Sequence, residues 1–125
     1  GDETAISRFF HRSRERRGFQ ALADGILDCA VLVFVELNKR PEAKRWDWWL
    51  ELKRRAIWRA LESLEQQTPN IGSRVDLGSI SIAVALAYLD LRGAVGEWRG
   101  RCPGLAAWFA VFSERPSMRA TAPPV

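Results

Sequence analysis

The sequence predicts an all-α domain of four main helices with a short C-terminal tail. Apolar residues recur every three or four positions in four segments, no segment has a convincing strand pattern, and proline or glycine separates the segments. With 125 residues, 47% of them hydrophobic and 27% charged, the chain can bury one core. We expect a single domain over residues 1–125, with a basic lead-in at 1–17, a helical core at 18–117 and a tail at 118–125.

The first helix is expected from about Thr4 or Ser7 to Asn38, because a helical repeat of apolar residues runs through this segment. Those residues are Phe19, Leu22, Ile26, Cys29, Ala30, Val33 and Leu37. Gly18 weakens the pattern and allows a kink or break near that residue. The run 31–35 has strand-like composition, but its position inside a long periodic segment favours a helix.

The second helix is expected to start at Pro41, which suits a first helical turn, and to run to about Gln67. Its broad apolar face contains Trp46, Trp49, Leu50, Ala56, Ile57, Ala60, Leu61 and Leu64. Lys53 lies at the centre of that face, and a buried lysine needs a partner. Asp24 and Asp28 lie one turn apart on the first helix, so we predict that Lys53 pairs with one of them.

Two tryptophans of the second helix lie off its apolar face. Trp48 and Trp58 are therefore candidates for an interface with a partner. The alternative is that both are isolated exposed side chains. That alternative is less favoured, because two tryptophans lie on one helix.

The third helix is expected from Asp76 to about Arg92, after a loop at 68–73. Its main face contains Ile80, Ala83, Val84, Ala87, Tyr88 and Leu91, and Ile82, Ala85 and Leu86 widen it. Because little polar surface remains, this should be the central helix. At its start, the Asp76 carboxylate can accept the backbone N–H of Ser79, while Val75 and Ile80 can form a hydrophobic staple.

The fourth helix is expected to begin at Pro103 and to end by Arg115–Pro116, and residues 120–125 form an extended tail. Its apolar stripe contains Leu105, Trp108, Phe109 and Phe112. Trp98, in the preceding loop, could cover the core or line a pocket.

Several fragments occur together in a familiar order. Residues 21–28 read Ala-Leu-Ala-Asp-Gly-Ile-Leu-Asp, residues 88–92 read Tyr-Leu-Asp-Leu-Arg, and 103–109 and 115–117 follow. Together they resemble the all-helical C-terminal domain of bacterial glutathione S-transferases, over about residues 19–124. That family usually has Ser or Thr at the helix cap and Asp three residues later, where this chain has Asp76 and Ser79. We expect the cap to hold and to be weaker, because serine has the shorter reach.

The resemblance implies the helical half of a protein that conjugates the glutathione thiolate to an electrophile. In that family, this half supplies the pocket for the hydrophobic co-substrate and much of the dimer surface. A thioredoxin-like domain, not recognisable here, holds glutathione and the catalytic Ser, Cys or Tyr. We therefore expect no catalytic residue and no cofactor in this chain, little activity alone, and glutathione only as co-substrate of the parent family.

Within that resemblance, the pocket candidates are Arg17, Gln20, Asp24 and Leu27, with Arg17 as an anion contact. The alternative, which we favour, is that Asp24 and Asp28 serve only as internal partners of Lys53 and Arg92. Arg92 could equally stabilise the C-terminus of its helix, where positive charge is favourable.

Composition limits the other classes of function. Two cysteines and one histidine are too few for a metal site. No continuous apolar run reaches the roughly 18 residues of a membrane span, so we expect a cytoplasmic protein. The net charge of +4 includes a basic run at 12–17, but Glu15 interrupts it and no nucleic-acid motif follows. A stand-alone interaction module ranks second and a nucleic-acid binder third. An unpaired docking face makes a homo-oligomer the expected state.

Overall fold

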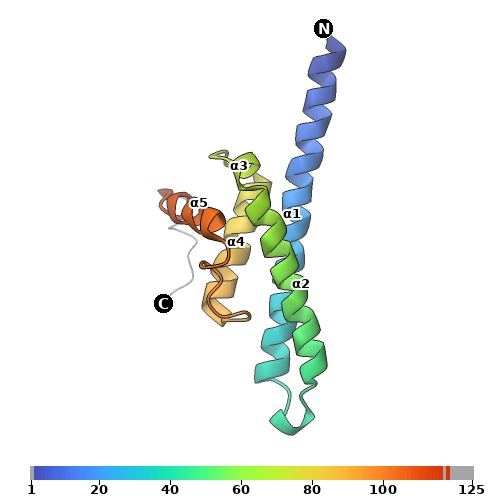
Figure 1. The fold of residues 1–125 in the computed structure, drawn as a ribbon, viewed down its shortest axis with the longest axis vertical. Coiled ribbons are helices and arrows are strands. Elements are labelled where there is room, and N and C mark those ends of the chain that lie inside the picture. Colours follow the sequence, from blue (N-terminus) through green and yellow to red (C-terminus); the bar gives the residue numbers. More distant parts are fainter. Residues whose placement is uncertain (1, 117, 119–125) are drawn as a thin grey trace.

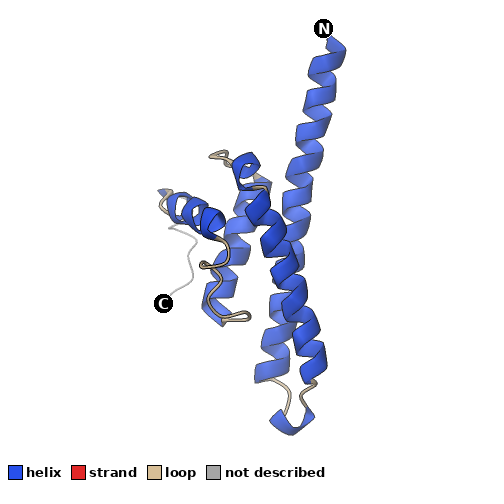
Figure 2. Cartoon of the chain, in the orientation of Figure 1, coloured by secondary structure: helices blue, strands red, loops and turns tan. Residues whose placement is uncertain are grey.

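The computed structural model describes residues 2–116 and residue 118, and side chains from Thr4 onward. Its helices are α1 (Asp2–Asn38), the 3-10 turn η1 (Glu42–Lys44), α2 (Asp47–Gln66), α3 (Thr68–Ile71), α4 (Leu77–Arg92) and α5 (Pro103–Ser113). The described residues contain no strand, which confirms the all-α prediction with four long helices (Figure 2).

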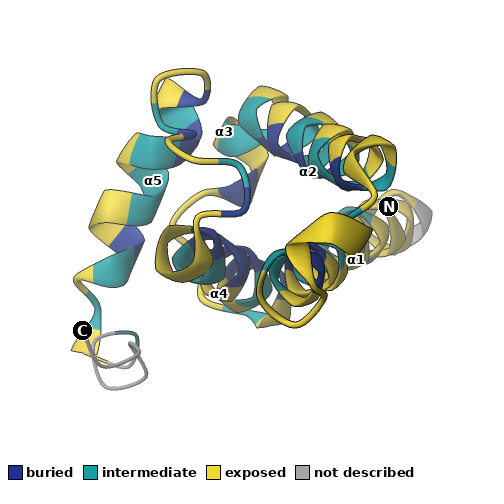
Figure 3. Ribbon diagram, turned by 90° about the horizontal axis from the view of Figure 1, so that it is seen from below, coloured by how far each residue is buried: buried dark blue, intermediate teal, exposed yellow. Residues whose placement is uncertain are grey.

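The long helices form a hairpin with two further layers. The helices α1 and α2 run in opposite directions on either side of η1, α4 packs along α1, and α5 contacts α2, α3 and α4 (Figure 1). The buried sides of α1, α2 and α4 face one another (Figure 3). Their largest fully buried side chains include Phe19, Ile26, Ile57, Leu61, Leu64, Ile82, Leu86 and Leu89. The N-terminal part of α1 projects beyond the other helices (Figure 1).

The first helix is longer and more continuous than predicted. It begins at Asp2 rather than Thr4 or Ser7, and it runs through Gly18 without a break. An internal glycine lowers helix stability by about 1 kcal/mol, and the contacts of the residues on either side of it can contribute more than this. The residues on either side of Gly18 include Arg16, whose side chain is held by hydrogen bonds, and Phe19, which is fully buried.

By length and composition, α1 is long and apolar enough between Thr4 and Asn38 to cross a membrane. This is weak evidence, because the core helix of a soluble protein passes the same test. Phe19, Ile26 and Val33 on α1 are fully buried in the core of the bundle. Val31, Leu32 and Val35 on the same helix are exposed, and 28% of the apolar window is buried, so α1 buries one side in the core and leaves another apolar side uncovered.

The α1–α2 connection differs from the prediction. Pro41 precedes the turn η1, and α2 begins only at Asp47. The buried carboxylate of Glu36 organises this connection, since it accepts hydrogen bonds from Arg40 Nε at 2.8 Å and from the Trp46 N–H at 3.1 Å. The predicted place of Trp46 in the core was wrong. Trp46 lies just before the first residue of α2 and is 58% exposed.

The predicted main face of α4 was right for Ala83, which is fully buried, and wrong for three of its residues. Ile80, Val84 and Leu91 are exposed, whereas the residues expected only to widen the face point into the core. The buried residues of α4 are Gly78, Ser79, Ile82, Ala83, Ala85, Leu86 and Leu89. Because the helix is apolar on nearly all sides, its sequence does not single out the buried one. Just before α4, a short helix, α3, occupies residues that we expected in a loop.

The last helix is anchored at its first turn. The carboxylate of Glu65 accepts the backbone N–H groups of Gly104 at 2.8 Å and Leu105 at 2.6 Å, two donors that α5 itself cannot satisfy. Trp98 is fully buried and donates its indole N–H to Asp90 at 3.0 Å. Trp98 therefore belongs to the core, and α5 runs from Pro103 to Ser113, which agrees with the predicted start and with an end by Arg115–Pro116.

Candidate functional site

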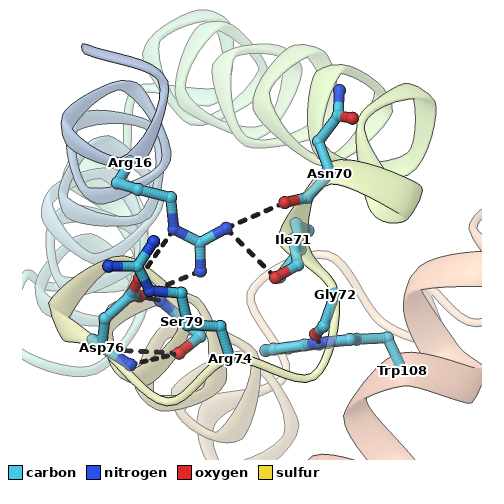
Figure 4. Close-up of polar contacts among 8 residues, drawn as sticks. All are labelled: Arg16, Asn70, Ile71, Gly72, Arg74, Asp76, Ser79 and Trp108. Atoms are coloured by element: carbon cyan, nitrogen blue, oxygen red, sulfur yellow. Dashed lines mark hydrogen bonds and ion pairs between the residues drawn. The ribbon is translucent and has the colours of Figure 1, made fainter. Parts of the chain in front are cut away.

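Arg16 joins three segments that are distant in sequence. Its Nε and Nη2 donate to the two carboxylate oxygens of Asp76 at 2.7 and 3.0 Å. Its Nη1 donates to the carbonyl oxygens of Asn70 at 2.8 Å and Ile71 at 3.1 Å. Figure 4 shows the guanidinium between α1, the end of α3 and the start of α4. We call this arrangement the Arg16 clamp.

Asp76 is also the N-cap of α4. Its carboxylate accepts the Ser79 N–H at 3.0 Å, and the Ser79 hydroxyl accepts the Asp76 N–H at 3.0 Å, which completes a capping box. The predicted cap is therefore confirmed, and serine does reach back to form the reciprocal bond. Val75 and Ile80 are both partly exposed, and their staple stays a prediction.

The environment of Asp76 lowers the pKa of its carboxyl. Burial alone would raise that pKa, but the hydrogen bonds from Arg16 and from the backbone of Ser79 favour the charged form and outweigh burial. Arg74 adds a further positive charge, with Nε 3.3 Å from the carboxylate.

The segment between α3 and α4 is held from the other side by the C-terminal part of the chain. Trp108 donates its indole N–H to the carbonyl of Gly72 at 2.7 Å, as Figure 4 shows. Arg115 donates to the carbonyl of Ser73 at 2.7 Å. The segment that leads into α4 is therefore held by contacts from α1, from α5 and from the residues that follow α5.

Beside the clamp lies an open hollow of about 670 Å³, between the projecting part of α1 and the first turn of α4. It is lined by Ala5, Arg8, Phe9, Arg12, Ser13, Arg16, Arg17, Gln20, Arg74, Asp76, Leu77 and Gly78. Gly78 lets the two helices approach closely, since a Cβ there would lie 3.0 Å from the backbone oxygen of Arg16. We call this feature the α1–α4 hollow.

The structure divides the four predicted pocket residues. Arg17 and Gln20 line the α1–α4 hollow. Asp24 lies further along α1 at an exposed position, and Leu27 packs against the core, so neither borders the hollow. Ligand contact by any of the four stays a prediction.

The predicted interior ion pair is not formed. Asp24 and Asp28 are both exposed, whereas the ammonium of Lys53 lies 5.2 Å from the centre of the Trp49 ring. Lys53 is only half-buried, so solvent and the aromatic ring satisfy its charge without a carboxylate. The guanidinium of Arg92 likewise lies over the ring of Phe34, at 4.3 Å.

The two interface candidates have different surroundings. Trp48 is 60% exposed, and its ring centre lies 5.1 Å from that of the exposed Trp46. Trp58 is half-buried against the core, and the guanidinium of Arg101 covers its ring at 4.0 Å. Trp48 thus remains available for a partner, together with Trp46, which the sequence had suggested for the core.

Sequence reasoning missed Arg16. It lies in the basic run 12–17, where nothing in the composition distinguishes it from the neighbouring arginines. One signal was present: Phe19, three residues on, belongs to the apolar face, and side chains three apart lie on the same side of a helix. In the described part of the chain, no group of His, Cys, Asp and Glu side chains could hold a metal ion.

Comparison with known proteins identifies a family. The family model described as "Glutathione S-transferase, C-terminal domain" matches residues 47–110. The chain is 35% identical over 111 residues to the uncharacterized GST-like protein YibF of Escherichia coli K12, covering 86% of this chain and 54% of that protein.

Solved structures agree. A glutathione transferase family member from Pseudomonas fluorescens Pf-5, with bound S-(propanoic acid)-glutathione, is 48% identical with a TM-score of 0.85, over 89% of this chain and 57% of that chain. A glutathione S-transferase from Methylobacterium radiotolerans, in complex with glutathione sulfonate, is 33% identical with a TM-score of 0.79, over 88% of this chain and 53% of that chain. The 125 residues thus span about half the length of these relatives.

Proposed function

Because the chain belongs to the glutathione S-transferase C-terminal domain family, we propose that it forms the co-substrate side of a glutathione-conjugating protein. The observation that carries this proposal is the α1–α4 hollow, whose wall is fixed by the Arg16 clamp. A pocket of this size, lined by apolar groups together with several arginines, suits a small organic molecule.

In the proposed reaction, the glutathione thiolate attacks an electrophilic carbon. A carbon–sulfur bond forms, the leaving group departs with its electron pair, and the thiol proton is released beforehand to solvent or a base. A thioredoxin-like domain would hold glutathione and lower the pKa of its thiol. The residues of this chain would position the electrophile, so the chain alone should turn over little or none of it.

The Pseudomonas fluorescens relative supports this division of roles. That protein was solved with bound S-(propanoic acid)-glutathione, a glutathione whose sulfur carries a second organic group. In the proposed arrangement, the equivalent group of this chain's product would lie in the α1–α4 hollow. We propose the cytoplasm as its location, where glutathione is the common thiol.

We also propose that the chain associates with a second copy. Leu77, Val84 and Leu91 occur every seven residues along one side of α4 and are 69%, 43% and 47% exposed. A row of exposed apolar residues at this spacing is typical of a helix that packs against another surface.

A stand-alone interaction module is the second candidate function. The exposed Trp46–Trp48 pair favours it, because tryptophan is enriched where proteins bind one another. Under this alternative, a Trp48→Ser variant would lose a partner and no transferase activity would depend on the chain.

A fusion protein tests the proposal. The part of the Pseudomonas fluorescens transferase that this chain does not match is joined to residues 1–125, and glutathione conjugation of chlorodinitrobenzene is measured. We expect turnover by the fusion and none by the chain alone. A fusion that folds by circular dichroism and binds glutathione, yet is inactive, would count against the transferase role, and the intact relative serves as the positive control.

A further inference from the structure

We propose that the α1–α4 hollow takes an apolar ligand that carries a carboxylate, and that Arg8 and Arg12 bind that carboxylate. The role of this ligand as a co-substrate rests on the function proposed above. The binding of the ligand to the hollow does not. Nothing in the family assignment specifies the charge of the molecule bound here.

The charges around the hollow are unbalanced. Its lining contains five arginines and a single aspartate. Asp76 is already neutralised by Arg16 and Arg74, which lie 2.7 and 3.3 Å from its carboxylate. Among the described residues, no ion pair connects Arg8, Arg12 or Arg17 to a carboxylate. The charges of Arg8 and Arg12 at this site therefore have no counter-ion among the described carboxylates.

Arg8 and Arg12 are spaced so that they can act together. They lie four residues apart on α1, one helical turn, whereas Arg17 lies nine residues after Arg8 on another side of the helix. Guanidinium groups bind carboxylates through two parallel hydrogen bonds, which makes arginine well suited to this ligand group. Ser13 and Gln20 lie in the same lining and offer further donors.

The rest of the lining is apolar. Phe9 and Leu77 border the hollow and are 65% and 69% exposed, and Ala5 lies between them and the start of α1. An exposed aromatic ring beside guanidinium groups favours a ligand with a flat apolar body and one acidic group. A nucleic acid would require a longer basic surface than this single hollow, so we favour the small acid.

Binding to the 125-residue chain tests the proposal directly. Naphthoate and naphthamide have the same apolar body and differ in charge, and each is titrated while backbone amide shifts are followed by NMR. We expect naphthoate to bind at least about fivefold more tightly, with shifts at the residues that line the hollow. Equal affinities, or shifts that lie elsewhere on the chain, would overturn the proposal.

Matched variants identify the residues. Arg8→Gln and Arg12→Gln remove one charge each from exposed positions on a helix, so folding should be retained. We expect each to weaken naphthoate binding by roughly threefold to tenfold, and naphthamide binding hardly at all. Arg14→Gln is the control, because Arg14 lies on the same segment outside the lining. If Arg14→Gln weakened naphthoate binding equally, non-specific attraction to the basic segment would replace the proposed site.

The fusion protein separates this proposal from the transferase role. Its turnover is measured with chlorodinitrobenzoate and with chlorodinitrobenzamide, which differ only in the charge of one group. We expect a lower KM for the acid, and loss of that preference in Arg12→Gln. Turnover without any preference would refute the acidic ligand and leave the transferase role standing. Binding of naphthoate to the hollow in an inactive fusion would support the acidic ligand and refute the transferase role.

Discussion

Replacing Arg16 by glutamine tests the Arg16 clamp. The variant loses two charged hydrogen bonds to Asp76 and two bonds to the carbonyls of Asn70 and Ile71. Both side chains of the ion pair are mostly buried, at 14% and 20% exposure, so solvent screens them only in part. Arg74 remains beside the carboxylate and offsets some of the loss. We expect a loss of about 2–3 kcal/mol in the free energy of unfolding.

Urea unfolding followed by circular dichroism measures this change, with Arg14→Gln as the matched control. Because Arg14 is exposed, its replacement should change stability by less than about 0.5 kcal/mol. The single variant Asp76→Asn and the double variant Arg16→Gln with Asp76→Asn complete a double-mutant cycle, whose coupling energy between the two side chains is expected to exceed about 1 kcal/mol. Equal effects of the two arginine variants, or a coupling near zero, would refute the clamp.

The clamp also has a pH signature. The pKa of Asp76 is lowered in the folded state, so its contribution to stability is fully present above the unfolded value of 3.8. That contribution is lost as the pH falls below 3.8 toward the folded pKa, because protonation then removes the ion pair. Arg16→Gln should therefore have a shallower loss of stability in this acid range. A variant with the wild-type acid slope would indicate that other carboxyls control it.

Three further changes test the packing around the site. Gly78→Ala should destabilise by about 1–2 kcal/mol, since the new Cβ would lie 3.0 Å from the backbone oxygen of Arg16, whereas Gly25→Ala meets nothing within 4 Å and should be neutral or stabilising. Urea unfolding compares the stabilities of the two variants. A change in the same direction for both variants would contradict the close contact at Gly78. Glu65→Gln should lower stability by at least about 1 kcal/mol, because the charge at the start of α5 is lost and an NH2 group, which cannot accept a backbone N–H, replaces one of the two acceptor oxygens; a neutral effect would show that one acceptor suffices. Burial raises the pKa of the Cys102 thiol and hides it, so a disulfide reagent should modify it only as fast as the protein opens, and prompt modification in the folded state would contradict its burial.

Periodicity was enough to predict the four long helices, because helix formation depends on residues three and four apart, but it missed the short elements η1 and α3. The core residues Phe19, Ile26 and Val33 of α1 follow from that repeat alone. Asp76 could also be predicted, since a capping box is a local pattern in the sequence.

Contacts between distant segments could not be predicted in this way. Arg16 and Asp76 are 60 positions apart, and five similar arginines were available to the aspartate. The mistaken pairing of Lys53 has the same cause. Its place on an apolar face suggested burial, but the depth of burial depends on how closely α1 approaches α2, which helical spacing does not determine.

The error on α4 leads to a conclusion about the chain itself. The sequence correctly indicated a helix with little polar surface, yet the 125 residues bury only one side of it and leave Leu77, Val84 and Leu91 exposed. An exposed apolar row is unfavourable in water unless another surface covers it. The relatives are nearly twice as long as the matched segment, so they contain residues that could do so. Two sets of contacts would explain why α4 is apolar on nearly all sides. One set is with α1 and the core, and the other would be with a surface outside these residues.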